Sequence, residues 1–428
     1  MKAAPLRVDP EQRFTCGSCA RCCRRWEILV SPAEVESFRS RDAARWFREA
    51  DGAPEGTTRD PFEAVPGWRG FHRIRKRDDG ACGFLSTDNR CRLHEELGGG
   101  RKPLTCRMFP YSFHPAPDAV IVTTSFGCPT VLANQGERIA DGAALESIKT
   151  LKGEWFAGRH HAAAPRVLVP GRAIDPASLR ILRDGLLTML NRAEGGRRDL
   201  RLNVRRMALV LDDLTRTRVV RLAGADFAEY VKLTVPYAAA ADTAVPARAP
   251  GWVGRLMQRG FLFVVAATRM RIEHAERSNF ELRLRMFRLL AHFHRLAPGF
   301  ERVNLAALSR KNGPAEAGRH INAHVDVNAP EIQPIAHHYL RASIQSLGAG
   351  DRPVLDDLAI AVSYLNAACA LAVMNARAAG RPVDGAVFSD ALMEAVDLSH
   401  SDERGLLGRA LRRFAGGVDA LHAFATQP

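Results

Sequence analysis

The chain of 428 residues is long enough to bury a substantial core, and its 46% hydrophobic and 25% charged residues are typical of a folded globular protein. Its formal net charge of +14 would suit a polyanionic partner, but only seven of the 61 basic residues are Lys, and the Arg residues are interleaved with acidic residues along helical stretches. No basic run alternates with aromatic residues as a stacking surface would. The composition therefore argues against a disordered chain and against a nucleic-acid binder.

The first residues lack the apolar segment of a secretory signal, because Asp9, Glu11 and Arg13 follow within a few positions. We therefore expect a cytoplasmic location, where thiols stay reduced. That expectation matters because eight of the nine cysteines lie within the first 128 residues. The eight are Cys16, Cys19, Cys22, Cys23, Cys82, Cys91, Cys106 and Cys128. Four disulfides would be the alternative use, but such frameworks belong to small secreted domains, so metal binding by all eight is the stronger hypothesis.

The spacing of the first cysteines indicates the kind of metal. Cys16, Cys19 and Cys22 repeat the C-x-x-C spacing twice, which lets sulfurs converge on one ion or cluster. Cys22 and Cys23 are neighbours, so we expect them to serve different sites, or one of them to lie outside the ligand set. Eight thiolates would satisfy two four-coordinate sites, or one cluster and another ion. The closely packed run favours an iron–sulfur cluster over zinc, and zinc stays open.

Other residues near the cysteines have predicted supporting roles. We expect His94 to hydrogen-bond to a ligand rather than to bind metal. Arg107 and the pair Arg101–Lys102 would offset thiolate charge. Trp26, shortly after Cys23, would shield the site from water.

Taken in chain order, the N-terminal part reads as short elements and loops. Ser31 with Glu34 forms a capping box that predicts a helix starting at Pro32. The β-branched run 119–124 predicts a strand. The composition changes near residues 162–171, which places a cysteine-rich domain at 1–150 and a mainly α-helical domain at 171–428. The expected fold class is thus α+β, with a small metal-binding module followed by helices.

The second part shows helical periodicity. Asp175–Pro176 caps a helix with Leu179, Leu182, Leu186 and Leu190 on one face, and Val204, Met207, Leu211 and Leu214 repeat the pattern. Ser278 and Glu281 predict a further helix, and the Ala- and Pro-rich stretch from Pro236 to Gly251 predicts a loop. His320 and His324 stand four apart by coincidence, because no Glu follows His320.

One apolar segment, Leu358 to Ala376, approaches the length needed to cross a bilayer. Its polar Ser363, Asn366 and Asn375 and its many Ala residues favour a buried bundle helix, so we expect no membrane span. Cys369 within it is expected to be a small buried hydrophobe.

The order of motifs in the first 130 residues resembles that of a known family. The motifs are Phe14-x-Cys-x-x-Cys-x-x-Cys-Cys, Cys-x-Phe-Leu, Cys-x-x-His, Lys-Pro-x-x-Cys-Arg-x-Phe-Pro and a final Cys-Pro. This series resembles the YkgJ-type cysteine-cluster family, CxxCxxCC, of zinc- or iron-chelating domains, some of which are described as flagellin lysine N-methylases. All eight family cysteines have counterparts here. The resemblance implies metal chelation, and beyond it a protein-lysine N-methyltransferase using S-adenosylmethionine, with flagellin as a protein partner.

Two function hypotheses follow. The first is a metal-dependent enzyme that methylates a protein lysine; the second is a non-catalytic structural metalloprotein, holding zinc, that serves as a binding module. Gly98–Gly100 follows no strand and carries no acidic partner, so it is not the usual nucleotide-binding turn. The sequence assigns neither a catalytic residue, a cofactor-binding residue nor an oligomeric state.

Overall fold

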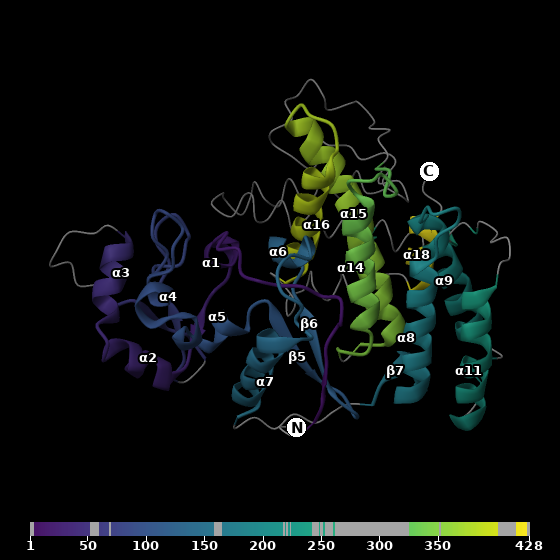
Figure 1. Ribbon diagram of the computed structural model, residues 1–428, viewed down its shortest axis with the longest axis horizontal. Coiled ribbons are helices and arrows are strands. Elements are labelled where there is room, and N and C mark those ends of the chain that lie inside the picture. The colour runs from purple at the N-terminus through teal and green to yellow at the C-terminus, as the bar shows by residue number, and fades with distance from the viewer. Residues whose placement is uncertain are drawn as a thin grey trace. The chain divides into compact units, whose positions relative to one another are not determined.

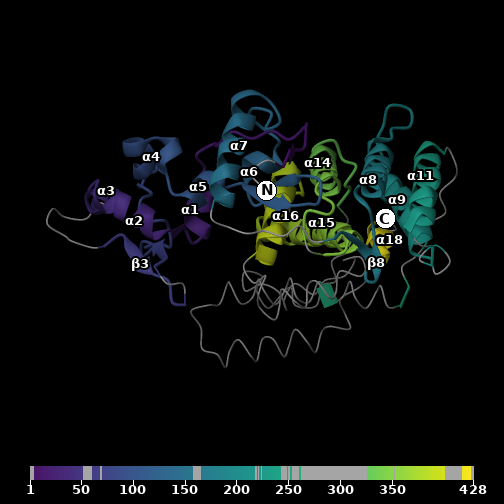
Figure 2. The same ribbon diagram turned by 90° about the horizontal axis from the view of Figure 1, so that it is seen from below.

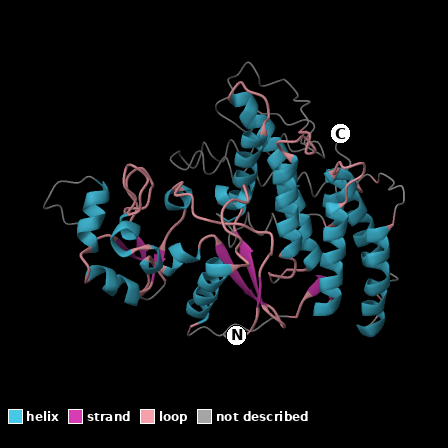
Figure 3. Ribbon diagram, in the orientation of Figure 1, coloured by secondary structure: helices cyan, strands magenta, loops and turns pink. Residues whose placement is uncertain are grey.

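The computed structural model describes residues 4–51, 60–67, 70–157, 165–216, 219, 221–222, 224–241, 248, 251–252, 260–261, 325–350, 352–400 and 417–425 (Figure 1). The chain divides into two compact units. The first comprises Met1–Phe113 and Val122–His161, and the second comprises His114–Ile121 and Ala162–Pro428. Small sheets accompany many helices (Figure 3), which confirms the α+β class with a mainly helical region after the cysteine-rich segment.

The first unit combines short helices with short strands. Its helices are α1 (Arg21–Arg25), α2 (Pro32–Arg39), α3 (Ala43–Asp51), α4 (Arg92–Leu97), the 3-10 turn η1 (Gly99–Arg101), α5 (Leu104–Met108), α6 (Pro129–Leu132) and α7 (Gly142–Phe156). Antiparallel strands β2 (Leu29–Val30), β4 (His72–Ile74) and β3 (Phe62–Ala64) form one sheet in that order. The other sheet has the order β1 (Leu6–Arg7), β6 (Val120–Thr124), β5 (Tyr111–Pro115).

Two local predictions, at residues 31–34 and 119–124, are confirmed. The Ser31 hydroxyl accepts from the Glu34 N–H while a Glu34 carboxylate oxygen accepts from the Ser31 N–H at 2.8 Å, so the capping box forms at the start of α2. The β-branched run appears as β6, with Val120, Ile121 and Val122 buried.

Helices α2 and α3 and the β2–β4–β3 sheet enclose an apolar cluster, here called the N-terminal core. Its buried members are Ala20, Ile28, Val30, Val35, Phe38, Ala43, Trp46, Phe47, Phe62, Ile74, Ala81, Cys82, Phe84, Leu85 and Leu93. Phe84 is fully buried, with Phe47 edge-on to it at 5.5 Å between ring centroids. Burying each side chain of this size contributes roughly 1.5–3 kcal/mol. The core therefore gives the adjacent cysteine loops a rigid base.

The second unit is built from helices α8 (Pro176–Asn191), α9 (Leu200–Thr215), α11 (Gly224–Ala240), α14 (Gln333–Gln345), α15 (Val354–Ala378), α16 (Gly385–His400) and α18 (Val418–Ala425), with a hairpin of β7 (Val167–Val169) and β8 (Arg172–Ala173). Helix α8 packs on α9, α11 and α14, and α15 packs on α16 and α18 (Figure 2). The two predicted Leu- and Val-rich faces are buried on α8 and α9, and the Asp175 carboxylate caps α8.

One prediction in this unit is wrong. The stretch from Pro236 onwards was expected to be a loop, but Pro236 lies inside α11, which continues to Ala240. Val231, Val235 and Ala239 are buried, and Val235 meets Gly185 of α8, where a Cβ would come within 2.2 Å of it. This packing outweighs the hydrogen bond that the proline removes. The predicted helix after Ser278 and the pair His320 and His324 lie outside the described residues.

Helix α15 is long and apolar enough, by length and composition, to cross a membrane over Val354–Val373, but 78% of its most apolar window is buried inside the structure. Ser363 and Asn366 are also buried, at 0% and 1% exposure. Both observations fit the predicted core helix of a bundle, and Cys369 is buried within it.

Candidate metal centre

The cysteine run folds as a tight loop that enters helix α1. Ser18 and Ala20 have φ angles of 53° and 58°, in the left-handed region that residues with a side chain seldom adopt. Such backbone conformations persist where surrounding structure imposes them, and they gather at functional sites. The loop leaves Cys16 and Cys19 exposed, while Cys22 and Cys23 lie half-buried on α1.

Two short hairpins, each with a cysteine on its returning arm, follow later in the unit. Lys76 pairs with Cys82 in the first hairpin, and Leu85 pairs with Cys91 in the second. Each turn holds one residue with positive φ, Gly80 at 79° and Asn89 at 61°. Asp79-Gly80-Ala81-Cys82 and Asp88-Asn89-Arg90-Cys91 are thus two copies of the pattern Asp-Gly/Asn-x-Cys. The sequence analysis missed this repetition, although Asp-Gly and Asp-Asn are turn signals.

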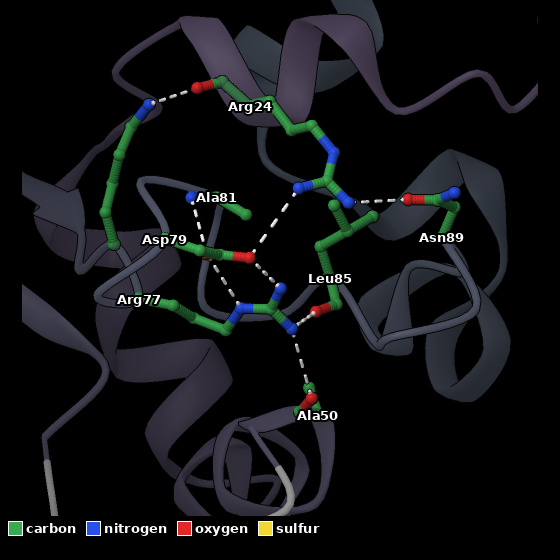
Figure 4. Close-up of polar contacts among 8 residues, drawn as sticks. Arg24, Ala50, Arg77, Asp79, Ala81, Leu85 and Asn89 are labelled. Atoms are coloured by element: carbon green, nitrogen blue, oxygen red, sulfur yellow. Dashed lines mark hydrogen bonds and ion pairs between the residues drawn. The ribbon is translucent and has the colours of Figure 1, made fainter.

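Arg77 and Asp79 fix the first hairpin (Figure 4). The Asp79 carboxylate accepts from the Ala81 N–H at 3.0 Å and pairs with the Arg77 guanidinium, which lowers the pKa of Asp79 to about 2. Arg77 also donates to the carbonyl oxygens of Leu85 at 2.6 Å and Ala50 at 3.5 Å. Arg77 therefore joins both hairpins to α3.

Arg24 connects helix α1 to the same hairpins (Figure 4). Its guanidinium donates to the Asn89 side chain at 2.9 Å and lies 3.6 Å from the Asp79 carboxylate. Its carbonyl oxygen accepts from the Lys76 ammonium at 3.1 Å. These bonds hold the segment after Cys22 and Cys23 beside both hairpin turns.

Five thiols gather at this side of the N-terminal core, and we call them the inner group: Cys22, Cys23, Cys82, Cys91 and Cys106. The Cys82 N–H donates to the Cys23 carbonyl oxygen at 2.8 Å. Cys82 belongs to the core itself, and Cys23, Cys91 and Cys106 pack against it. The sulfurs of Cys22 and Cys23 are 3.9 Å apart. Both neighbours therefore lie at the same side of the N-terminal core, and the expectation that they serve different sites, or that one lies outside the ligand set, stays a prediction.

Burial is the main cause of the raised pKa values of three thiols in the inner group, Cys82, Cys91 and Cys106. It raises the pKa of Cys82 to about 12 and the pKa values of Cys91 and Cys106 above their ordinary value. For Cys106, negative charge on Cys82 or Cys91 would raise the pKa further, while Lys102 acts in the opposite direction on both Cys91 and Cys106. Several thiolates placed together in an apolar setting need a cation, and metal binding would displace their protons.

Glu34 and Thr105 position Cys106. The second carboxylate oxygen of Glu34 accepts from the Leu104 N–H at 2.7 Å at the start of α5, and the Thr105 hydroxyl donates to the Leu29 carbonyl oxygen at 2.9 Å. Glu34 therefore caps α2 and also receives the first N–H of the helix that carries Cys106. Sequence reasoning found only its capping role.

Arg107 chiefly holds α5 against α7. Its guanidinium makes a two-pronged ion pair with Glu154, with one bond of 2.8 Å, and donates to the Lys102 carbonyl oxygen at 3.0 Å. Glu154 is also the main cause of the raised pKa of Arg107, with Cys106 as a smaller contributor. Among the basic residues predicted to offset thiolate charge, Lys102 opposes the rise in the pKa values of Cys91 and Cys106. Trp26 packs edge-on against Phe109 at 4.3 Å, and His94 is exposed on α4.

The remaining three thiols, Cys16, Cys19 and Cys128, form an outer group. Cys128 is the N-cap residue of α6. Gly17 lies against Thr130 in the first turn of that helix, since a Cβ on Gly17 would come within 3.2 Å of the Thr130 hydroxyl. Burial raises the pKa of Cys128, Cys19 adds to the rise, and backbone hydrogen bonding from Val131 and Thr130 opposes it.

A short antiparallel contact brings the ends of this segment together. Arg13 pairs with Arg138, and the Phe14 N–H donates to the Glu137 carbonyl oxygen at 2.9 Å. The Arg13 N–H donates to the Asn134 side chain at 2.7 Å. The chain just before Cys16 is therefore tied to the chain just after Cys128.

The eight thiols thus fall into two neighbourhoods of the first unit. Within the described ranges, no three His, Cys, Asp or Glu side chains meet closely enough to hold one metal ion as they stand. The donor chemistry nevertheless fits zinc or iron, because soft thiolate sulfur is the ligand type that both metals take in Cys-rich sites. Backbone hydrogen bonding from Phe84, His94 and Val131 lowers the pKa values of Cys82, Cys91 and Cys128 respectively, and would stabilise bound thiolates.

Comparison with known families agrees with this donor set. Residues 15–129 match the family model CxxCxxCC, whose description is "putative zinc- or iron-chelating domain". The matched segment contains all eight cysteines. Neither the curated proteins nor the solved structures contain a match to the chain. The predicted resemblance to the CxxCxxCC zinc- or iron-chelating domains is therefore confirmed over residues 15–129.

Proposed function

We propose that the cysteine-rich segment binds metal through its eight N-terminal cysteines, with an iron–sulfur cluster favoured over zinc. The observation that carries the proposal is the gathering of Cys23, Cys82, Cys91 and Cys106 on one apolar core. Hydrogen bonds join α1 to both hairpins, and others join α5 to Glu34 and Leu29. A bound zinc ion would crosslink these elements, and an iron–sulfur cluster would add electron transfer. The chain's own residues set the position, burial and hydrogen bonding of the thiols.

The preference for iron rests on the run Cys16 to Cys23, in which four thiols occur within eight residues. Elemental analysis and an absorption spectrum of protein purified without oxygen test it. Iron with sulfide and a broad band in the blue region would support the cluster. Two zinc ions and no colour would contradict it and favour a structural module. Protein without either metal would overturn metal binding itself.

We also propose, on the family resemblance, that the metal segment supports methylation of a protein lysine, with flagellin as the first substrate to test. Gly98–Gly100 does not supply the usual cofactor turn, because it forms the 3-10 turn η1 after helix α4. Calorimetric titration with S-adenosylmethionine, followed by mass spectrometry of flagellin after incubation, decides the matter. No heat of binding and no added methyl group would reject the methylase.

A structural zinc module that binds partners is the second candidate. The packing of the inner group on the N-terminal core favours it, because crosslinking loops that a small core supports is what structural zinc does. In that case zinc removal would unfold the segment without changing any reaction of the protein.

A further inference from the structure

The two groups of thiols differ in their access to solvent. Cys82 of the inner group is buried, and Cys22, Cys23, Cys91 and Cys106 are half-buried. In the outer group, Cys16 and Cys19 are exposed and Cys128 is buried. A ligand set with two exposed sulfurs is open to exchange with molecules in solution, whereas one built into an apolar core is shielded from them.

The two groups also differ in how many thiols they hold. The inner group has five, which is enough for a closed four-coordinate site. The outer group has three, on two segments joined by the contact of Gly17 with Thr130 and by the pairing of Arg13 with Arg138. Three protein ligands leave one position of a tetrahedral ion available, as in zinc sites that bind an exogenous molecule.

The positions of Cys22 and Cys23 also indicate that the outer group supplies only three thiols. The Cys23 carbonyl oxygen accepts from the Cys82 N–H, and Cys23 packs on the N-terminal core. The Cys22 sulfur lies 3.9 Å from that of Cys23. We therefore assign both residues to the inner group.

We propose that the segment holds two metal centres of unequal accessibility: a closed one formed by the inner group, and an open one formed by Cys16, Cys19 and Cys128. The fourth ligand of the open centre comes from solution. This inference rests on the proposed metal binding. It assigns retention of metal to the inner group and exchange of metal or ligand to the outer group.

The test uses the full chain loaded with zinc and the chromogenic chelator 4-(2-pyridylazo)resorcinol, which reports released zinc by absorbance. We expect two zinc ions per chain, released in one fast and one slow phase of about equal amplitude. Cys19→Ser and Cys128→Ser should remove the fast phase and keep the slow one. Cys369→Ser, which changes a buried cysteine of the other unit, is the control and should keep both phases.

A second measurement covers the case in which a variant fails to fold. The wild-type chain is alkylated with iodoacetamide before and after the fast-released zinc is removed, and the labelled peptides are identified by mass spectrometry. Labelling should appear first at Cys16 and Cys19, the two exposed thiols of the outer group. Labelling that spreads equally to Cys82 and Cys106, or a single release phase in the wild type, would overturn two separate centres while leaving metal binding intact. A wild-type chain that takes up no zinc and contains no iron would instead overturn the proposed function.

Discussion

Glu34 joins two helices through one carboxylate. One oxygen accepts from Ser31 at the start of α2, and the other accepts from the Leu104 N–H at the start of α5, the helix that carries Cys106. A side chain that satisfies two helix N-termini contributes more than an ordinary cap, because its removal leaves unpaired N–H groups at both. Glu34 is thus a positioning residue for the inner group.

Replacing this carboxylate should weaken the first unit. We expect Glu34→Ala to lower the free energy of unfolding by about 1–2 kcal/mol, through loss of the cap and of the Leu104 bond. Urea denaturation followed by circular dichroism measures the change. Glu36→Ala, on an exposed position of the same helix, should change stability by less than about 0.5 kcal/mol. Equal effects of the two variants would contradict the role of Glu34.

The cysteines allow a second test at this scale. We expect Cys106→Ala to lower the bound metal, because it removes a proposed ligand of the inner group. Cys19→Ala should also lower it, whereas Cys369→Ala should bind as much metal as the wild type. Inductively coupled plasma mass spectrometry gives the metal content. Unchanged metal in both Cys106→Ala and Cys19→Ala would show that the cysteine cluster is not the site.

His337 on α14 makes the second unit sensitive to acid. Burial, aided by Arg198 and Arg341, lowers the pKa of His337 to about 4, and its ring lies 2.8 Å from the Asn191 side chain. In the unfolded chain the His337 imidazole is protonated as the pH falls through about 6.5, whereas in the folded chain it stays neutral until about pH 4. We expect stability to fall as pH drops from 6.5 to 4, and to fall less in His337→Gln. Hydrogen exchange of α8 and α14 at pH 7 and 4.5 measures the loss of stability in the wild type and in His337→Gln. An equal loss in the two proteins would contradict the role of His337.

At the scale of elements, the two cysteine hairpins depend on one left-handed residue each. Gly80 has a φ of 79°, and a Cβ there would meet no other atom within 4 Å. Gly80→Ala should therefore destabilise through backbone strain alone, by about 1 kcal/mol. Gly153 in helix α7 also has open space around it but a helical backbone, so Gly153→Ala should stabilise by about 0.5–1 kcal/mol. Thermal unfolding compares the two, and the same sign for both would reject the argument.

Sequence reasoning succeeded where a signal is local. The capping box at Ser31, the strand at 120–124 and the buried faces of α8 and α9 follow from residues within one element. It failed at Pro236, because the contact between Val235 and Gly185 joins two helices that are distant in the chain. It also failed to divide the eight cysteines, since the bond from Cys82 to Cys23 and the contact of Gly17 with Thr130 are long-range.

At the scale of the whole molecule, the cysteines proposed as ligands all lie in the first unit, and Cys369 lies in the second. A chelator should therefore act on the first unit alone. We expect metal removal from the full chain to increase hydrogen exchange in residues 76–91 and in α5, with α8 and α9 unchanged. Hydrogen-exchange mass spectrometry measures the exchange of both units in one sample. A similar increase throughout the chain would contradict independent stabilisation by the metal.

The contact between Gly17 and Thr130 closes a loop of more than a hundred residues, whereas each hairpin closes a loop of only a few residues. Joining distant points removes more freedom from the unfolded chain than joining near ones, and the cost grows with the logarithm of the enclosed length. The two hairpins can form early and locally, while the outer group comes together only after the intervening chain has folded. An ion held by Cys16, Cys19 and Cys128 would then bind after the rest of the segment has folded. It would stabilise the folded segment by linking residues that are far apart in the chain, as a disulfide that closes a long loop does.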